Sequence, residues 1–283
     1  MTNSSNPTRA DFMFLILPPA PVLATLVKGY WFIEDLPGEH AGHLIRTSPV
    51  PLAVLSVNIG RPNAAEDGGL VPNVSLLGLQ SQSRAWRSWS DTYFVMVMLT
   101  IPGFVRLFPN TGSGSAGMLL DLAALTGEAP ARTLKNGVGM EQEPRQIAGF
   151  LDQWLISRTS STQPVLEGKQ IAIAHSILRN GGSVETAAET AQVNRRQLHR
   201  LFHRHLGMGP KELADLERLH SSLRSVQRGS GEPVHGFCDQ AHQIRSWKRR
   251  LGVTPGTYAR AVRTSLTEYV GTDRTSSGIA YYF

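Results

Sequence analysis

The segment VNRRQLHRLFHRHLG, residues 193–207, concentrates side chains that can bind either an anion or a metal ion. It holds four arginines and three histidines in fifteen residues, interrupted by apolar side chains at Leu198, Leu201, Phe202 and Leu206. Arginine guanidinium groups bind phosphates and guanine edges, whereas histidines four residues apart on a helix can hold zinc. A solvated basic helix is the third alternative. The elements that position these residues distinguish between the three chemistries.

These residues have the pattern of a capped, amphipathic helix. Asn194 is a suitable N-cap, and the apolar positions fall on one face together with His205. Two shorter helical patterns precede it, QIAIAHSILRN (170–180) and VETAAETAQ (184–192), the second of which can start at Ser183. Two short helices, a tight turn and a basic third helix predict a helix-turn-helix. The outward face of the third helix carries Arg196, His199, Arg200 and His203.

The sequence repeats this basic helix 45 residues further along the chain. NRRQLHRLFHRHLGMGPKEL (194–213) and DQAHQIRSWKRRLGVTPGTY (239–258) align without gaps. Each copy begins with a capping residue, carries an aromatic residue in the core phase, and ends with a glycine followed by a helix-breaking proline. Two such helices, joined by a long connecting helix, can enter successive major grooves about 34 Å apart on B-DNA.

The closing segment, GFCDQAHQIRSWKRRLGVTPGTYAR (236–260), resembles a motif of the AraC family of bacterial transcription regulators. In that family the motif reads Gly-Phe-x-Asp-Gln-Ser-His-x-x-Arg-x-Phe-Lys-Arg-x-x-Gly-x-Thr-Pro-x-x-Tyr-Arg, and the resemblance covers about a hundred residues. It implies a double helix-turn-helix that recognises promoter DNA. It also implies contact with RNA polymerase, with activation favoured over repression, and a location in the cytoplasm at the nucleoid.

Individual residue roles follow from side-chain chemistry and from the repeat. Arg196 and Arg200 lie one turn apart on the outward face, and each can present a bidentate fork to guanine. Gln240 suits adenine, whereas cations at the helix flanks suit the phosphate backbone. The predicted base contacts are Arg196, Gln197, His199, Arg200, Gln240 and Arg245. The predicted phosphate contacts are Arg195, Arg204, Lys248 and Arg249.

The second copy departs from the first at two places. Gln243 stands where the first copy has Leu198, and burying its amide unpaired would cost roughly 1–3 kcal/mol. Only the six residues SGEPVH separate Gly229 from Gly236, where the family has room for a short helix, and Pro233 disfavours one. We therefore expect the second helix-turn-helix to be less stable or repacked, and the first to dominate specific readout.

The charge distribution also points to the C-terminal third. Residues 166–263 contain 16 Lys and Arg against 8 Asp and Glu, whereas the remainder contains 12 against 14. This is the footprint of a polyanion-binding module, with a solvated basic surface as the alternative. The longest apolar stretch, residues 93–101, is about half of a membrane span, and residues 1–21 lack the features of a secretory signal. With Cys238 as the single cysteine, a reducing cytoplasm is expected.

The N-terminal part predicts a β-rich domain. Runs rich in Val, Leu, Ile and aromatic residues, separated by Pro, Gly and Asn, occur at 22–35, 51–60, 74–82 and 93–101. They predict a sheet or a small, cupin-like barrel, and they loosely resemble the sensor or dimerisation domains of part of the family. A small-molecule effector and a homodimer are therefore expected. Candidates to line a ligand pocket, with a structural role as the alternative, are Trp31, Trp86 and Trp89.

The expected fold class is α+β in two domains. The predicted boundaries are a sensor or dimerisation domain with a terminal helix at 1–157, a linker at 158–168, a double helix-turn-helix at 169–264 and a flexible tail at 265–283. GSGSAG (112–117) is expected to be a flexible loop. Helical spacing follows it, with a core stripe at Ile147, Phe150, Leu151, Trp154 and Leu155.

Other chemistries are weaker. His199 and His203 have a zinc-binding spacing, but no cysteine or carboxylate shares their face and the flanking arginines oppose a cation. His40 and His43 are expected in an exposed loop, and Cys238 as a small buried residue. We expect no metal, no cofactor, no catalytic residues and no membrane partner. The alternative from another class is a small-molecule-binding or enzymatic β-barrel with a degenerate DNA-binding module.

Overall fold

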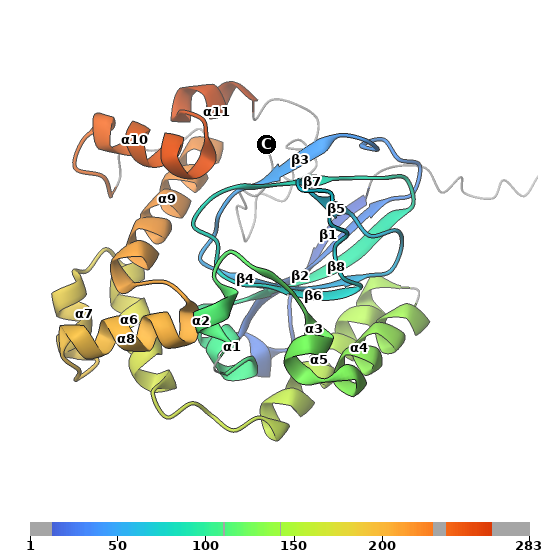
Figure 1. Ribbon diagram of the computed structural model, residues 1–283, viewed down its shortest axis with the longest axis horizontal. Helices are drawn as coiled ribbons and strands as arrows, with labels where there is room; N and C mark the ends of the chain where they lie inside the picture. Colours follow the sequence, from blue (N-terminus) through green and yellow to red (C-terminus); the bar gives the residue numbers. More distant parts are fainter. Residues whose placement is uncertain (1–12, 110, 142, 229–235, 262–283) are drawn as a thin grey trace, which may run out of the picture.

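The computed structural model describes residues 13–109, 111–141, 143–228 and 236–261. Strands occur only in the first half of these residues, and the second half is built from helices (Figure 1). The α+β class expected from the sequence is therefore confirmed, with a β-rich N-terminal region and a helical C-terminal region. Within the described ranges, no helix combines the length and the apolarity that crossing a membrane requires.

Two antiparallel sheets form the N-terminal region and face each other across its interior (Figure 1). The six-stranded sheet has the order β1 (Met13–Leu17), β2 (Val27–Asp35), β8 (Thr92–Leu99), β4 (Ala53–Asn58), β6 (Val74–Leu77) and β9 (Leu119–Asp121). The three-stranded sheet has the order β3 (Leu44–Thr47), β7 (Arg84–Arg87) and β5 (Ala64–Ala65). Each of the four apolar runs in the sequence contains a strand of the larger sheet, so the predicted sheet or small barrel is confirmed.

Strict alternation along the strands gives the larger sheet two apolar faces. In β4, Leu55 and Val57 are fully buried against the helices, whereas Val54, Ser56 and Asn58 turn toward the smaller sheet. Because successive side chains of a strand point to opposite faces, the same segment supplies both a helix-packing surface and a cavity wall.

Helices cover the outer face of the larger sheet. They are the 3₁₀ turn η1 (Pro21–Leu23) and the helices α1 (Ile101–Leu107), α3 (Leu122–Thr126), α4 (Glu128–Met140) and α5 (Pro144–Ser161). In the predicted stripe of α5, Ile147, Leu151 and Leu155 are fully buried, and Phe150 and Trp154 pack against the same core. The stripe is therefore confirmed as core.

The segment 112–117 is not a loop throughout, so that prediction is wrong. Its first four residues form α2 (Gly112–Ser115), which packs against the C-terminal end of a later helix. A Cβ atom on Gly112 would lie 2.0 Å from the carbonyl carbon of His205. Glycine is therefore present because two backbones approach closely here, and flexibility is not its role.

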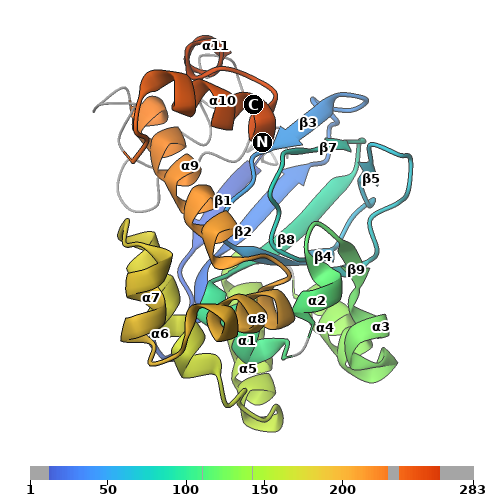
Figure 2. The ribbon, with the colours of Figure 1, turned by 60° about the vertical axis from the view of Figure 1, so that its left-hand side comes forward.

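The C-terminal helices are arranged around one long connector. They are α6 (Gly168–Arg179), α7 (Val184–Thr190), α8 (Arg195–Leu206), α9 (Pro210–Arg228), α10 (Gln240–Leu251) and α11 (Pro255–Ala261). At 1.5 Å per residue, the 19 residues of α9 span about 28 Å. Figure 2 shows α9 leaning between α6–α8 at one end and α10 and α11 at the other.

The two ends of α9 have different cores. Around α6–α8 the apolar cluster is continuous with that of the sheet and α5, whereas α10 and α11 share a separate cluster around Trp247 and Tyr258. Because α5 ends at Ser161 and α6 starts at Gly168, a short connection joins the two regions. The predicted ranges 1–157, 158–168 and 169–264 stay predictions, and the predicted tail at 265–283 lies outside the described residues.

Candidate nucleic-acid interface and ligand cavity

The duplicated helices α8 and α10 are capped as the repeat predicts. The side chain of Asn194 accepts a hydrogen bond from the Gln197 amide at 2.8 Å, and Gln197 Oε1 accepts one from the Asn194 amide at 2.9 Å. This reciprocal pair is a capping box. At the start of α10, Asp239 accepts from the His242 amide at 2.6 Å. Both helices end in a left-handed glycine, Gly207 or Gly252, so each has defined ends.

The predicted inward and outward faces of α8 are both confirmed. The buried residues of α8 are Leu198, Leu201, Phe202, His205 and Leu206. All residues that the sequence assigns to DNA are exposed: Arg195, Arg196, Gln197, His199, Arg200 and Arg204 on α8, and Gln240, Arg245, Lys248 and Arg249 on α10. Exposure leaves these side chains accessible, but their individual roles remain predictions.

Some of these outward side chains are held by neighbours. Arg195 Nη1 lies 2.9 Å from Glu185 Oε1, and Arg204 Nη1 lies 3.8 Å from Glu167 Oε1, in exposed pairs that stabilise little. The Gln197 amide oxygen is occupied by the capping box. Among the described residues, Arg196 and Arg200 form no ion pair or hydrogen bond, so they are the better candidates for base contact.

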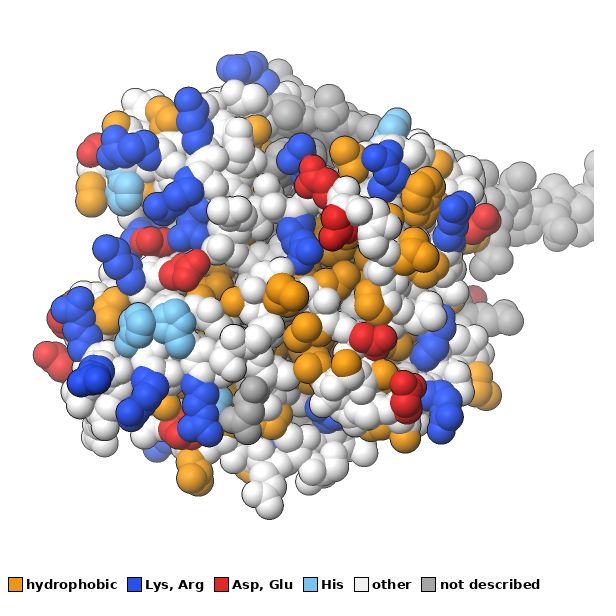
Figure 3. Space-filling view, viewed as in Figure 1, with side chains coloured by type: hydrophobic (Ala, Val, Ile, Leu, Met, Phe, Trp, Pro, Cys, Tyr) orange, Lys and Arg blue, Asp and Glu red, His pale blue; other side chains and the backbone are white. Residues whose placement is uncertain are grey.

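A concave basic surface lies between the two helix-turn-helix motifs. Lys and Arg side chains gather over this side of the molecule, at the left of Figure 3. The cations lining the cleft are Arg195, Arg196, Lys211, Arg218, Arg249 and Arg250, next to the imidazoles of His199 and His203. Ser81 and Gln82 of the β-rich region form part of its wall. The cleft therefore brings both motifs and the β-rich region together.

The second motif is better packed than the sequence suggests. Gln243 is buried, but its Nε2 donates to Ser222 Oγ at 3.0 Å, and the indole N–H of Trp247 donates to the same oxygen at 3.1 Å. The Gln243 amide is therefore paired, because α9 places a buried hydroxyl opposite it. The lower stability or repacking expected of the second motif stays a prediction. The shortened segment SGEPVH lies outside the described residues.

Cys238 is exposed, so its prediction as a buried residue is wrong. The partly buried neighbour Phe237 makes the aromatic contact at this turn, with its ring centroid 5.4 Å from that of His242. The apolar position before α10 is thus displaced by one residue.

Sequence reasoning missed Arg250, which connects α10 to the β-rich region. Its Nη1 donates to the carbonyl oxygen of Ser81 at 2.9 Å, and the Ser83 amide donates to the Arg250 carbonyl oxygen at 2.7 Å. Burial lowers the pKa of Arg250 from its usual value. In the 45-residue repeat Arg250 aligns with His205, whose backbone meets Gly112. The same repeat position in both copies therefore contacts the N-terminal region. The alignment equates the two positions, but only the structure shows what they touch.

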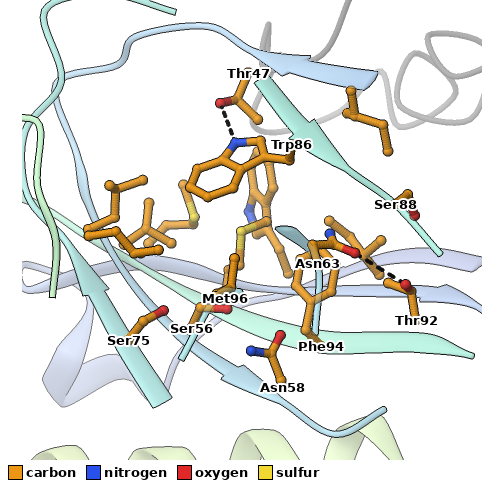
Figure 4. A pocket seen from close by; sticks show the side chains of 18 of the residues that line it. Thr47, Ser56, Asn58, Asn63, Ser75, Trp86, Ser88, Thr92, Phe94 and Met96 are labelled. Carbon is orange, nitrogen blue, oxygen red and sulfur yellow. Dashed lines mark hydrogen bonds between the residues drawn. The ribbon is translucent and has the colours of Figure 1, made fainter. Parts of the chain in front are cut away.

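A cavity of about 130 Å³ lies between the two sheets. Trp31 and Trp86 line it, as predicted, whereas Trp89 does not, and Arg61 covers its ring at 4.6 Å. Figure 4 shows Trp86, Phe94 and Met96 around the cavity, with serine and asparagine side chains at its lower edge.

The two histidines of the β-rich region, His40 and His43, differ in exposure. His43 is exposed as predicted, but His40 is partly buried, lines the cavity and lies 3.5 Å from Asp35. Among the described residues, no group of three His, Cys, Asp or Glu side chains could hold a metal ion.

Comparison with known proteins supports this assignment of the helices. A family model for a helix-turn-helix domain matches residues 187–261. No protein with curated annotation matches the chain.

Among solved structures the chain is similar to ToxT from Vibrio cholerae O395, with 10% identity, a TM-score of 0.46, and coverage of 83% of this chain and 98% of that one. An apo lysine-to-alanine variant of ToxT from strain SCE256 gives 14% identity and a TM-score of 0.46, covering 82% of this chain and 96% of that one. Unsaturated fatty acid bound wild-type ToxT from the same strain gives 11% and 0.44, with 88% and 96% covered.

The chain has two capped, basic helices at the ends of one connecting helix, in a region that a helix-turn-helix family matches. This combination defines a DNA-binding transcriptional regulator. The match falls on the residues that carry the AraC motif, Gly236 to Arg260. Over these residues the chain resembles the AraC family of bacterial transcription regulators, and the match shows a helix-turn-helix domain.

Proposed function

We propose that this regulator acts in the cytoplasm by reading a DNA site through α8, with α10 engaging the next major groove on the same face. The observation that carries the proposal is the pair Arg196 and Arg200, exposed one turn apart on a helix whose opposite face is buried. Each can donate two hydrogen bonds to one guanine. Lys248 and Arg249 on α10 hold the phosphate backbone.

A comparison of Arg200→Ala with Lys248→Ala tests this division of roles. Binding is measured by fluorescence anisotropy on sites selected from random duplexes, over a series of salt concentrations. Arg200→Ala should cost about 1–3 kcal/mol on the preferred site and relax selection at one base position. Lys248→Ala should weaken every sequence alike and reduce the salt slope by about one unit. If Arg200→Ala binds every sequence as the wild type does, the base-contact assignment is wrong.

We also propose that the protein acts by binding and without catalysis, that it contacts RNA polymerase, and that it activates transcription more than it represses it. Self-association through the β-rich region belongs to the same proposal. These points rest on the family resemblance.

The effector site is the cavity between the sheets, and the segment 80–83 links it to DNA binding. Gln80 lines the cavity, and the next residue, Ser81, accepts the hydrogen bond from Arg250 of α10. A molecule that moves Gln80 therefore acts on the second recognition helix through Ser81, the residue that is bonded to both Gln80 and Arg250. A shift of this segment changes how α10 sits relative to α8.

Arg250→Met tests the link without a ligand, because it removes the donors while keeping an apolar side chain of similar length. Amide hydrogen exchange in residues 80–83 and α10 should become faster. DNA affinity should rise about fivefold or more, because α10 is released from the sensor region to follow the groove. Arg260→Met, at an exposed position on α11, is the control. Unchanged exchange and affinity in Arg250→Met would contradict the link.

A further inference from the structure

The cavity between the sheets is small, and its apolar wall combines aromatic side chains and methionines with aliphatic ones. Phe14 and Trp31 meet edge to face at 5.4 Å on one side, and Trp86, Phe94 and Met96 form the other walls (Figure 4). Engineered cavities of about 150 Å³ bind a single benzene ring. The volume of about 130 Å³ therefore fits a compact one-ring molecule, and the flat aromatic faces and the sulfur favour an aromatic one.

The indole N–H of Trp86 is already occupied. It donates to Thr47 Oγ1 at 3.0 Å, so the ring turns an apolar face to the interior. This fixed hydrogen bond holds the ring in place before any ligand arrives. The face of Trp86 is thus a stacking surface, and its polar atom is not a ligand contact.

Three buried polar side chains at the cavity have atoms without a hydrogen-bond partner among the residues that the structure describes. They are the hydroxyls of Ser48 and Ser75 and the amide Nε2 of Gln80, on residues that are 3%, 1% and 7% exposed. Ser75 pairs in register with Ser56 of the neighbouring strand, which also lines the cavity. Because a buried polar group without a partner is costly, a ligand that hydrogen-bonds these groups removes that cost.

Other polar side chains of the cavity are hydrogen-bonded within the protein. Asn58 Nδ2 donates to the Pro72 carbonyl oxygen at 2.8 Å, and Thr92 Oγ1 lies 3.2 Å from Asn63 Oδ1. Ser48, Ser75 and Gln80 therefore offer a ligand buried hydrogen-bonding groups that Asn58 and Thr92 do not.

The cavity provides no lysine or arginine among the described residues that line it. Its one carboxylate, Asp35, accepts from the Glu39 amide at 2.8 Å and the His40 amide at 2.9 Å, and it is also the group that faces the His40 imidazole. An anionic ligand would lie near this carboxylate without a guanidinium or ammonium partner. Burial of an unpaired charge is costly, so the cavity selects against anions.

We infer that the effector is a small, uncharged aromatic compound that carries a hydroxyl or amide group, and that aromatic carboxylates are excluded. The ring stacks between Trp86 and the Phe14–Trp31 pair, and the polar group bonds Ser75 and Gln80. This inference rests on the proposed effector cavity and specifies its ligand class.

The test compares benzamide and benzyl alcohol with benzoate, which has the same ring and a negative charge. Binding to the full chain is followed at millimolar probe concentrations by tryptophan fluorescence, since Trp31 and Trp86 line the site. The two neutral probes should bind with saturation, and benzoate should bind at least tenfold more weakly. Ser75→Ala should weaken benzamide binding about three- to tenfold, whereas Ser113→Ala, at an exposed position on α2, should leave it unchanged.

A second variant introduces the missing charge at the cavity rim. Ile45, on β3, lines the cavity and is only partly buried, so a lysine there can keep its ammonium group near solvent. Ile45→Lys should reverse the preference in favour of benzoate. Equal binding of benzoate and benzamide to the wild type would overturn the ligand class while leaving the cavity as a binding site. Failure of all three probes to bind would overturn the effector cavity together with the inference, while DNA binding, measured separately, would be unaffected.

Discussion

The contact between α2 and α8 can be broken by one methyl group. A Cβ atom on Gly112 would lie 2.0 Å from the His205 carbonyl carbon and 2.3 Å from the Leu206 amide nitrogen. Ordinary contact begins near 3.4 Å, so Gly112→Ala must separate the two backbones by about 1.4 Å. Overpacking of this kind costs roughly 1–3 kcal/mol. For a chain of this size the melting temperature should fall by roughly 2–10 °C.

Gly114 provides a matched control in the same short helix. It is exposed, and a Cβ atom there would meet nothing within 4 Å. Gly114→Ala should therefore leave the melting temperature unchanged or raise it slightly, because alanine lowers the entropy of the unfolded chain. Differential scanning calorimetry of both variants measures the difference, and limited proteolysis reports whether α8 detaches. If Gly112→Ala is as stable as Gly114→Ala, α2 does not pack on α8 as described.

Three other outcomes follow from buried polar groups. Ser222→Ala leaves the indole N–H of Trp247 without its acceptor and should destabilise the second motif by roughly 1–3 kcal/mol in urea unfolding. Tyr30→Phe removes the hydroxyl that donates to Asp152 at 2.6 Å, and should cost roughly 1 kcal/mol in the same assay. Burial lowers the pKa of His220 to about 4, so the unfolded chain binds more protons between pH 6.5 and pH 4. The free energy of unfolding should therefore decrease by up to about 3 kcal/mol as the pH is lowered from 6.5 to 4. His220→Gln should reduce this decrease in unfolding experiments over a range of pH.

Each of these outcomes has a control or a contrary result. Ser221→Ala, exposed on the same helix, should change nothing, and an equal loss in both serine variants would show that the hydrogen bond is not the cause. A urea unfolding curve of Tyr30→Phe that coincides with the wild-type curve would show that the hydroxyl contributes nothing. His43→Gln, at an exposed position, should keep the acid dependence that His220→Gln reduces, and identical pH profiles for the two would refute the assignment.

The DNA-binding region is predictable because its signals are local. Capping residues such as Asn194 and Asp239, the glycine ends and the 3.6-residue apolar period all act within one helix. The repeat then assigns the same roles twice, so the inward face of α8 could be read from the order of residues alone. The strands of the larger sheet were predictable for the same reason, since an apolar run between turn residues is a local pattern.

Contacts between distant segments were beyond such reasoning. Gln243 looked unsatisfied because its partner, Ser222, is on another helix, and only packing brings the two together. Gly112 looked flexible because the backbone of α8, which excludes any side chain there, is far away in the sequence. Arg250 looked like one more surface cation of a basic helix, until the fold placed the Ser81 carbonyl oxygen within its reach.

The cavity shows the same division most clearly. Alternation along the strands could indicate which residues share a face, but it could not show whether that face is filled, solvated or hollow. The answer depends on the separation of two sheets whose strands come from all parts of residues 13–121. Local sequence thus predicted a DNA-binding region with two capped basic helices, because capping and helical periodicity act over a few residues. The tertiary structure alone decided that the β-rich region encloses a cavity, since the shape and charge of a cavity arise from side chains that meet only after folding.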